Sequence, residues 1–208
     1  MMEGNEKRTP PTKRIVLGSS SKWRRAVLER MYPGHAFVQL SPDIDEKSIR
    51  HDSPGVLPAL IADAKMEALL EKFPEQVEDA LLIASDQVAS YGGVIREKPR
   101  DEAEARLFLA SYRGSSVQTY SAIAVMNTAT GKRRCEVDVA TIHVREDLPD
   151  AVIDAMIAKG DIFTCCGGFA IEDEGFSKYI THIEGEQSSV EGFPASVVDR
   201  LLHELGGS

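Results

Sequence analysis

Short apolar runs alternate with amphipathic segments along most of the chain, and they predict interleaved strands and helices. Arg14–Gly18 and Ala80–Ala84 are short, mainly apolar runs of the length of buried strands. Ala36–Leu40 reads as a further strand. Ser116–Asn127 and Lys132–Arg145 are longer, and the glycine turn between them predicts a hairpin.

Helices are predicted where apolar residues recur every three or four positions. A glycine or proline soon after the last periodic residue marks the end of such a segment. These signals predict helices over Lys22–Met31, Val56–Phe73, Asp101–Tyr112, Pro149–Lys159 and Pro194–Leu205. Since strands and helices interleave but hairpins are also present, the chain predicts an α/β fold with a mixed, twisted sheet flanked by helices.

Length and composition indicate one globular domain. The chain has 208 residues, of which 42% are hydrophobic and 27% charged, as in ordinary soluble proteins. We expect a disordered tail over residues 1–13 and a single domain over residues 14–208. No apolar run has the length of a membrane span or a secretory signal. We therefore expect a cytoplasmic protein with no membrane partner.

The charge balance argues against bulk nucleic acid as a partner. The formal net charge is −9, whereas duplex-binding proteins usually carry a basic domain or stripe. A small anion can still bind where a few cations are focused. The three cysteines, Cys135, Cys165 and Cys166, lack the spacing of a zinc site and are interpreted as reduced thiols.

A serine-rich loop leads into a basic helix near the N-terminus. Its residues are Ser19, Ser20, Ser21, Lys22, Trp23, Arg24 and Arg25. Three cations in a first helical turn oppose the helix dipole, at a cost of about 0.3–1 kcal/mol each. A bound anion would reverse the sign of this effect, so the loop suggests a phosphate site. The alternative is a solvated basic helix with its charges splayed outward.

Carboxylates occur in two places where they could serve phosphate chemistry. Asp86 directly follows the apolar run Ala80–Ala84, at the predicted end of that strand, which suits a general base or a metal ligand. Glu46 ends an acidic turn that also holds Asp43 and Asp45, and with Asp86 it could bind Mg²⁺. The alternatives are an aspartate that caps a turn and a charged surface turn.

Lys65 and Lys98 could neutralise phosphate charge, although a solvated lysine is the alternative at each position. The five histidines show no HExxH motif and no paired spacing, and we interpret them as structural or surface residues.

Several short motifs, taken in order, resemble the Maf family of nucleotide pyrophosphatases. The matching strings are IVLGSSSKWRR from residue 15, SPDIDE from residue 41, Ala64-Lys65, IASDQV from residue 83, EKP from residue 97 and CCGGFAIEDEG from residue 165. The pattern closes with Ile183-Glu184-Gly185, Val190, Gly192 and Pro194. Any one string is weak, but the ordered set is specific and covers nearly the whole chain.

The resemblance implies an architecture like that of inosine-triphosphate pyrophosphatases, with a cleft between two lobes. It implies cleavage of a nucleoside triphosphate between the α- and β-phosphates by an activated water, with Mg²⁺ or Mn²⁺ as cofactor. By the match, Asp86 is the proton acceptor and Glu46 its acidic partner, both able to hold the metal, while Arg24, Lys65 and Lys98 face the phosphates. Homodimers are common in the family.

The resemblance also bears on the substrate. One branch of the family acts on dTTP and UTP and has Arg, Thr and Gln at three specificity positions; another acts on 7-methyl-GTP and has Trp, Gln and Glu. This chain has Trp23, Gln87 and Glu172 there, as in the second branch. N7-methylation makes guanine cationic, an indole face attracts a cation, and we expect Glu172 to accept hydrogen bonds from the base edge.

Two departures from the family pattern stand beside this match. Glu97 replaces the usual glycine before Lys98, and Lys22 occupies a position where proline is common. Neither residue is one that the pattern assigns to chemistry, although Lys22 could alter the shape of the loop. The alternatives are a dTTP and UTP pyrophosphatase of the same family, and a non-catalytic nucleotide-binding regulator of cell division.

Overall fold

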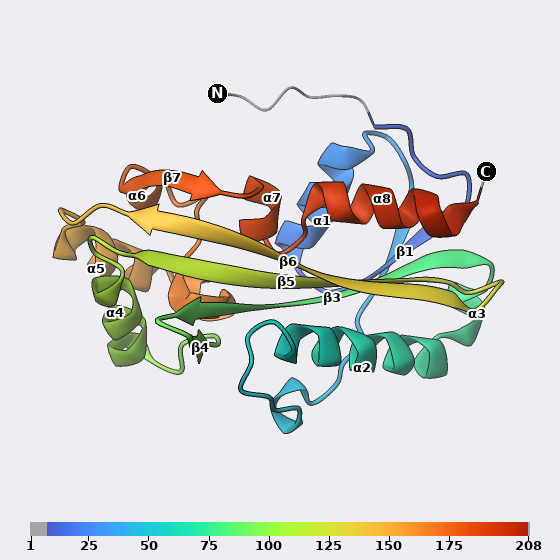
Figure 1. The fold of residues 1–208 in the computed structure, drawn as a ribbon, viewed down its shortest axis with the longest axis horizontal. Coiled ribbons are helices and arrows are strands. Elements are labelled where there is room, and N and C mark those ends of the chain that lie inside the picture. The colour runs from blue at the N-terminus through green and yellow to red at the C-terminus, as the bar shows by residue number, and fades with distance from the viewer. Residues whose placement is uncertain (1–7, 208) are drawn as a thin grey trace.

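The computed structural model describes residues 8–207, which form one mixed sheet with helices packed on both of its faces (Figure 1). Its strands are β1 (Arg14–Gly18), β2 (Phe37–Leu40), β3 (Ala80–Tyr91), β4 (Val94–Arg96), β5 (Ser116–Asn127), β6 (Lys132–Val144) and β7 (Ile180–Glu184). They lie in the order β2-β1-β3-β5-β6-β7, and β4 pairs with β3. The pairs of β1 with β2 and with β3 are parallel and the others antiparallel, which confirms the predicted fold class.

The predicted helices are all present, with ends within about two residues of those expected. The helices are α1 (Lys22–Met31), η1 (Glu46–Ser48), α2 (Leu57–Lys72), α3 (Pro74–Val77), α4 (Glu102–Ser111), α5 (Asp150–Lys159), η2 (Asp161–Thr164), η3 (Cys166–Gly168), α6 (Glu174–Ser177), α7 (Gln187–Val190) and α8 (Ala195–Gly206), where η marks a 3-10 helix. None of them, within residues 8–207, combines the length and the apolar character that a bilayer crossing requires.

Residues 1–7 of the predicted tail lie outside the described residues. Residues 8–13 contain neither helix nor strand, and Pro11 among them is buried.

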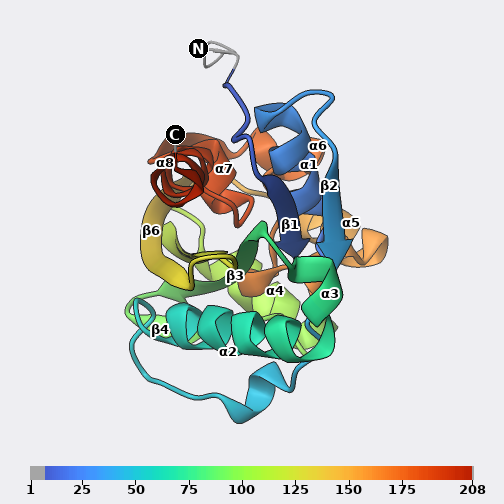
Figure 2. The same cartoon turned by 90° about the vertical axis from the view of Figure 1, so that its right-hand side faces the viewer.

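Successive residues of β3 face two different apolar cores. Leu81 and Ile83 pack with α1 and α8, whereas Leu82 and Ala84 pack with α2. Figure 2 shows α1 and α8 on one side of the sheet and α2 on the other. This two-residue period is the pleat of a strand buried on both faces.

A third core occupies the far end of the long strands. It joins the ends of β5 and β6 to α4 and α5, and its largest buried side chains are Tyr112 and Phe176. Figure 1 shows α4 and α5 at the end of the sheet opposite α8. The middle of β3 therefore lies between two groups of helices: α1, α2 and α8 pack on the first two cores, and α4 and α5 pack on the third.

The strand that carries Asp86 is longer than predicted, and this corrects the expected position of that residue. The prediction ended at Ala84, but β3 continues to Tyr91 and pairs with β5 as far as Ser90, with Asp86 opposite Ala122. The run Ser85-Asp86-Gln87 interrupts the apolar pattern, so periodicity alone could not extend the strand. What ends at this level is β1, whose last residue, Gly18, lies opposite Ala84.

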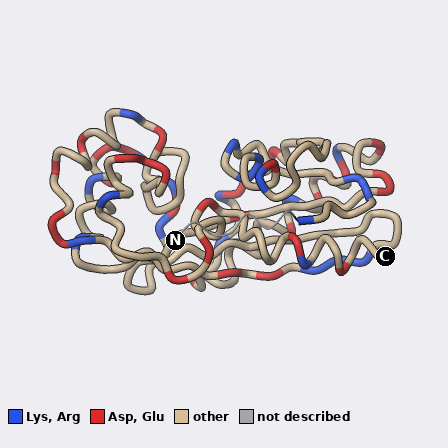
Figure 3. Tube along the Cα trace, turned by 90° about the horizontal axis from the view of Figure 1, so that it is seen from above, with Lys and Arg blue, Asp and Glu red and all other residues tan. Residues whose placement is uncertain are grey.

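Charged side chains are spread over the molecule. Figure 3 shows Lys and Arg interspersed with Asp and Glu over both helical groups, with no continuous basic stripe along the part of the chain that is described.

Candidate active site

The end of β1 leaves an open edge beside the middle of β3, and Arg24 reaches into it. Its Nη1 donates to the Ser85 carbonyl oxygen at 2.8 Å and lies 3.4 Å from Ser19 Oγ, while its Nε donates to the Gly192 carbonyl oxygen at 3.2 Å. The guanidinium thus pairs with a strand carbonyl beyond the last residue of β1. Arg24 is held by the neighbouring Ser19 and by two segments distant in sequence, which fixes its position before any ligand binds.

Ser21 caps α1, which explains why a basic segment begins a helix there. Its hydroxyl accepts from the Arg24 backbone N–H at 3.4 Å, and no acidic residue lies in the first turn. The unusual charge pattern seen in the sequence is therefore present in the structure. Ser19 is buried and Ser20 exposed, so the three serines have different surroundings.

Lys65 joins the two candidate carboxylates. Its ammonium lies 2.8 Å from Asp86 Oδ1 and 2.8 Å from Glu46 Oε1. Asp86 lies on the α2 side of the sheet by the pleat of β3, and Lys65 projects from α2. Lys65 is 5% and Asp86 6% exposed, whereas the Glu46 side chain is 39% exposed. The cluster therefore runs from a buried carboxylate to one that meets solvent.

Burial sets the two carboxylates apart electrostatically. Loss of solvent raises the pKa of Asp86, although Lys65 and Arg24 act in the opposite direction. Burial also acts to raise the pKa of Glu46, but the ion pair with Lys65, together with the charges of Lys98 and Arg24, outweighs it and lowers that pKa. One carboxylate is thus made a stronger base while its neighbour is kept ionised.

Lys98 stands at the open side of this cluster. It is exposed, and its positive charge acts to lower the pKa of both Glu46 and Cys166. The backbone carbonyl of the preceding residue, Glu97, accepts a hydrogen bond from the Gly167 N–H at 3.0 Å. This bond joins the loop that carries Lys98 to η3. The residue type at position 97 does not affect this contact, because it uses the backbone.

Arg25 is not part of the group that the structure brings together. It pairs with Glu29 at 2.9 Å on the same helix and donates to Gln39 at 3.1 Å. Its position one residue after Arg24 turns it to another side of α1.

Gln87 is held by a network that the sequence did not reveal. Its Nε2 donates to Ser121 Oγ at 3.0 Å and to the carbonyls of Ser189 and Val190 at 2.9 and 3.1 Å, and its Oε1 accepts from the Cys166 thiol at 3.1 Å. Burial raises the Cys166 pKa to about 12, so the thiol remains a donor. All four partners come from segments far from Gln87 in sequence, and no spacing rule could have identified them.

Lys22 lies against Trp23, and its charge also acts on the other remaining candidate, Glu172. Its ammonium lies 4.8 Å from the centre of the Trp23 ring and 3.0 Å from Asp161 Oδ1. Crowding by neighbouring protein atoms raises the pKa of Glu172, whose side chain is nonetheless exposed, and Glu191 adds to the rise while Lys22 opposes it. A cation already occupies the indole face in the protein alone.

The carboxylates of Glu46 and Asp86 suit a hard divalent cation. Both approach one ammonium group, so they converge, and carboxylate oxygens are the donors that Mg²⁺ prefers. Only one oxygen of each carboxylate is engaged by Lys65. The donor set therefore fits the cofactor that the motifs imply.

Sequence comparisons with known proteins agree with the motifs, and one solved structure shows a remote likeness. A structural likeness to a HAM1 protein from Coxiella burnetii has a TM-score of 0.39 and 12% identity, over 65% of this chain and 75% of that chain. A protein of Dictyostelium discoideum named 7-methyl-GTP pyrophosphatase is 38% identical over 195 residues, which is 92% of this chain and 96% of that protein. The family model described as Maf-like protein matches residues 14–205. This chain belongs to the Maf family.

Proposed function

We propose that this protein is a hydrolase that cleaves a nucleoside triphosphate between its α- and β-phosphates, and that 7-methyl-GTP is its preferred substrate. The observation that carries the proposal is the Asp86–Lys65–Glu46 cluster beside Arg24, with Asp86 and Lys65 buried, in a chain 38% identical to a protein named 7-methyl-GTP pyrophosphatase. Attack of water on a phosphoanhydride requires a base that accepts a proton from the water and cations that offset the phosphate charge. A basic carboxylate next to fixed cations can supply both.

In the proposed reaction Asp86 accepts a proton from water as the water oxygen bonds to the α-phosphorus. The bond from the α-phosphorus to the bridging oxygen breaks, and its electron pair leaves on that oxygen with pyrophosphate. Lys65 positions the Asp86 carboxylate through the 2.8 Å ion pair. Arg24 and Lys98 bind the phosphate oxygens and offset their charge as the leaving group departs.

A divalent ion, when bound by Glu46 and Asp86, supplies charge neutralisation to the triphosphate. Mg²⁺ and Mn²⁺ are the candidates, and activity should be lost when the assay contains neither ion.

Base preference rests on the surroundings of Trp23 and Glu172. The indole attracts a cation, as its contact with the Lys22 ammonium illustrates. The raised pKa of Glu172 marks a carboxylate crowded by protein atoms, where pairing with a cationic base would be favourable. Gln87 lies between these groups and the phosphates in our proposal, held rigidly by its hydrogen-bond network.

The test is pyrophosphate release from a panel of GTP, 7-methyl-GTP, dTTP and UTP, with and without Mg²⁺ or Mn²⁺. We expect metal-dependent release with the highest kcat/KM for 7-methyl-GTP. A clear preference for dTTP or UTP would place the chain in the other branch, and inactivity on all four would favour a nucleotide-binding regulator.

The control variant is Asp86→Asn, which keeps the size of the side chain and removes the base. Turnover should fall at least about 10²-fold, within the range that a lost general base costs, while nucleotide binding persists. Unchanged turnover would remove Asp86 from the proposed role.

A further inference from the structure

The strand pair β6–β7 carries two histidines and a glutamate on one face, outside the candidate active site. In the register of this antiparallel pair His143 lies opposite His182, and Thr141 lies opposite Glu184. Between them Ile142 and Ile183 face the core. The alternation of a strand therefore places His143, His182 and Glu184 together on the outward face.

The ligand atoms of these three residues converge. His143 Nε2 lies 2.8 Å and His182 Nε2 3.6 Å from Glu184 Oε1, and all three ligand atoms fall within 4.8 Å of one another. The two imidazoles stack, with centroids 4.0 Å apart and planes 9° from parallel. Tetrahedral zinc with bonds near 2.1 Å has ligand atoms about 3.4 Å apart, which is close to the spacing seen here. Because the lone pair of an imidazole nitrogen lies in the plane of its ring, the two rings must rotate out of their parallel stack for both to bind one ion.

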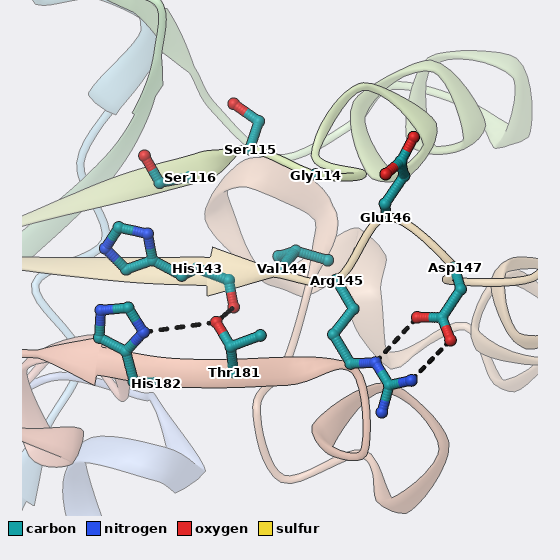
Figure 4. Close-up of a pocket in the computed structure, with 10 residues that line it drawn as sticks. All are labelled: Gly114, Ser115, Ser116, His143, Val144, Arg145, Glu146, Asp147, Thr181 and His182. Atoms are coloured by element: carbon teal, nitrogen blue, oxygen red, sulfur yellow. Dashed lines mark hydrogen bonds and ion pairs between the residues drawn. The ribbon is translucent and has the colours of Figure 1, made fainter.

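A bulge in β7 orients His182. The register shifts beside His143, so that Val144 pairs with Ile180 and Thr181 is left as the extra residue. Thr181 Oγ1 donates to the His143 carbonyl oxygen at 3.1 Å, which uses its hydrogen, and it lies 3.4 Å from His182 Nδ1 (Figure 4). Toward His182 the hydroxyl can therefore act only as an acceptor, so His182 carries its hydrogen on Nδ1. This leaves His182 Nε2 with its lone pair toward Glu184. This outer contact is the kind that fixes the tautomer of a metal-binding histidine.

The surroundings leave the site accessible and its carboxylate free of stronger partners. His143 and His182 line a surface hollow of about 660 Å³. Arg145, at the other side of that hollow, is engaged by both oxygens of Asp147 at 2.8 and 2.6 Å. Within residues 8–207 Glu184 pairs with the two histidines and with no Lys or Arg.

We propose that His143, His182 and Glu184 bind a divalent transition-metal ion, best matched by Zn²⁺, with water in the remaining coordination position. Two imidazoles and one carboxylate are a donor set that zinc accepts with an open fourth position. Because β7 is the edge strand of the sheet, the bound ion joins this edge to β6. The site does not depend on the proposed reaction, since none of its ligands belongs to the candidate active site.

The test is equilibrium dialysis of the full chain against Zn²⁺, with Tm measured on the same samples. Wild-type protein should bind one tight equivalent and gain Tm. His182→Ala and Glu184→Gln should each weaken that binding at least tenfold and lose the gain in Tm. Thr181→Val, which keeps every ligand, should weaken it about tenfold because only the outer contact is lost.

Matched variants separate this site from other metal-binding groups of the chain. Asp86→Asn alters the candidate active site and Cys135→Ser removes an exposed thiol, so both should keep the tight equivalent. Without metal, the circular dichroism of His182→Ala, Glu184→Gln and Thr181→Val should match that of the wild type, because these three side chains are exposed. Wild-type affinity in His182→Ala, loss of the tight equivalent in Asp86→Asn, or no saturable binding below millimolar Zn²⁺ would each overturn the proposal.

Discussion

At the scale of single residues, the sharing of one ammonium by two carboxylates decides how the candidate base titrates. Lys65 contacts Asp86 and Glu46 at equal distances, yet the two pKa values move in opposite directions because Asp86 is buried and Glu46 is partly exposed. A raised pKa makes Asp86 a better proton acceptor near neutral pH. Glu46 remains ionised and keeps the cluster negative enough to attract a cation.

The direction of the Asp86 shift predicts the acid side of the activity profile. The base works only when ionised, so kcat should fall as pH drops through the raised pKa. The midpoint should lie above about 4, where an unperturbed aspartate titrates. The measurement is kcat at saturating nucleotide from pH 4 to 9, because kcat reports groups in the bound complex. A profile that stays flat down to pH 4 would contradict the assignment of Asp86.

Lys22 offers a second test at this scale, because its ammonium competes for the indole face of Trp23. In Lys22→Met a cationic base would meet that face without a like charge beside it. An exposed cation–π contact is worth about 0.5–1 kcal/mol. The ratio of KM for GTP to KM for 7-methyl-GTP should therefore rise about 2–5-fold, measured under initial-rate conditions.

The ratio of KM values distinguishes an effect on binding of the base from an effect on binding of the phosphates, since loss of a positive charge near the triphosphate would raise both KM values together. Lys22→Arg keeps the charge and should leave the ratio near that of the wild type. An unaltered ratio in Lys22→Met would indicate that the indole does not contact the base.

At the scale of elements, the close packing of α2 against β1 depends on Gly18, a residue without a side chain. A Cβ added at Gly18 would lie 2.2 Å from Leu69 Cδ1 and 2.8 Å from the Ile83 carbonyl oxygen. The leucine can rotate, but the strand backbone cannot yield without disturbing the β1–β3 pairing. Gly18 thus allows α2 to lie close enough for Lys65 to reach Asp86.

Gly18→Ala should consequently destabilise the protein by about 1–3 kcal/mol, as overpacking of a core typically does. The measurement is the free energy of unfolding in urea. Gly55→Ala is the matched control, because a Cβ there meets only Ser53 Oγ at 3.9 Å, and it should stay within about 0.5 kcal/mol of the wild type. Equal stabilities for the two variants would show that the loop after β1 absorbs the added methyl group.

Local patterns predicted the elements well and failed where tertiary contacts decide. β1 and α1 have the predicted ends because apolar runs, a serine cap and a proline–glycine pair all act locally. β3 was predicted too short because the polar run at Ser85 interrupts the apolar pattern. That run is buried by contacts with α2 and α1, which the local sequence does not reveal. The histidine pair on β6 and β7 was likewise missed, because only the strand register brings residues 143 and 182 together.

At the scale of the whole molecule, the candidate site draws on both helical groups. Arg24 and Lys65 come from helices packed on the cores at the β1 end. Cys166 belongs to the cluster at the far end, and Lys98 lies on a loop fastened to η3. A nucleotide that contacts all of them would connect the two ends through its own bonds, in addition to β3, β5 and β6.

Ligand binding should therefore stabilise the molecule as one unit. At a hundredfold excess over its Kd a ligand adds about 2.7 kcal/mol. For a chain of this size the expected rise in Tm is about 5–10 °C. The measurement is calorimetry of Asp86→Asn, which should bind 7-methyl-GTP without consuming it. A single transition that moves as a whole supports a site built across both groups, and GTP at equal concentration should move it less. Two transitions, of which only one responds, would confine the nucleotide to one end and exclude either Arg24 or Lys98 from its phosphates.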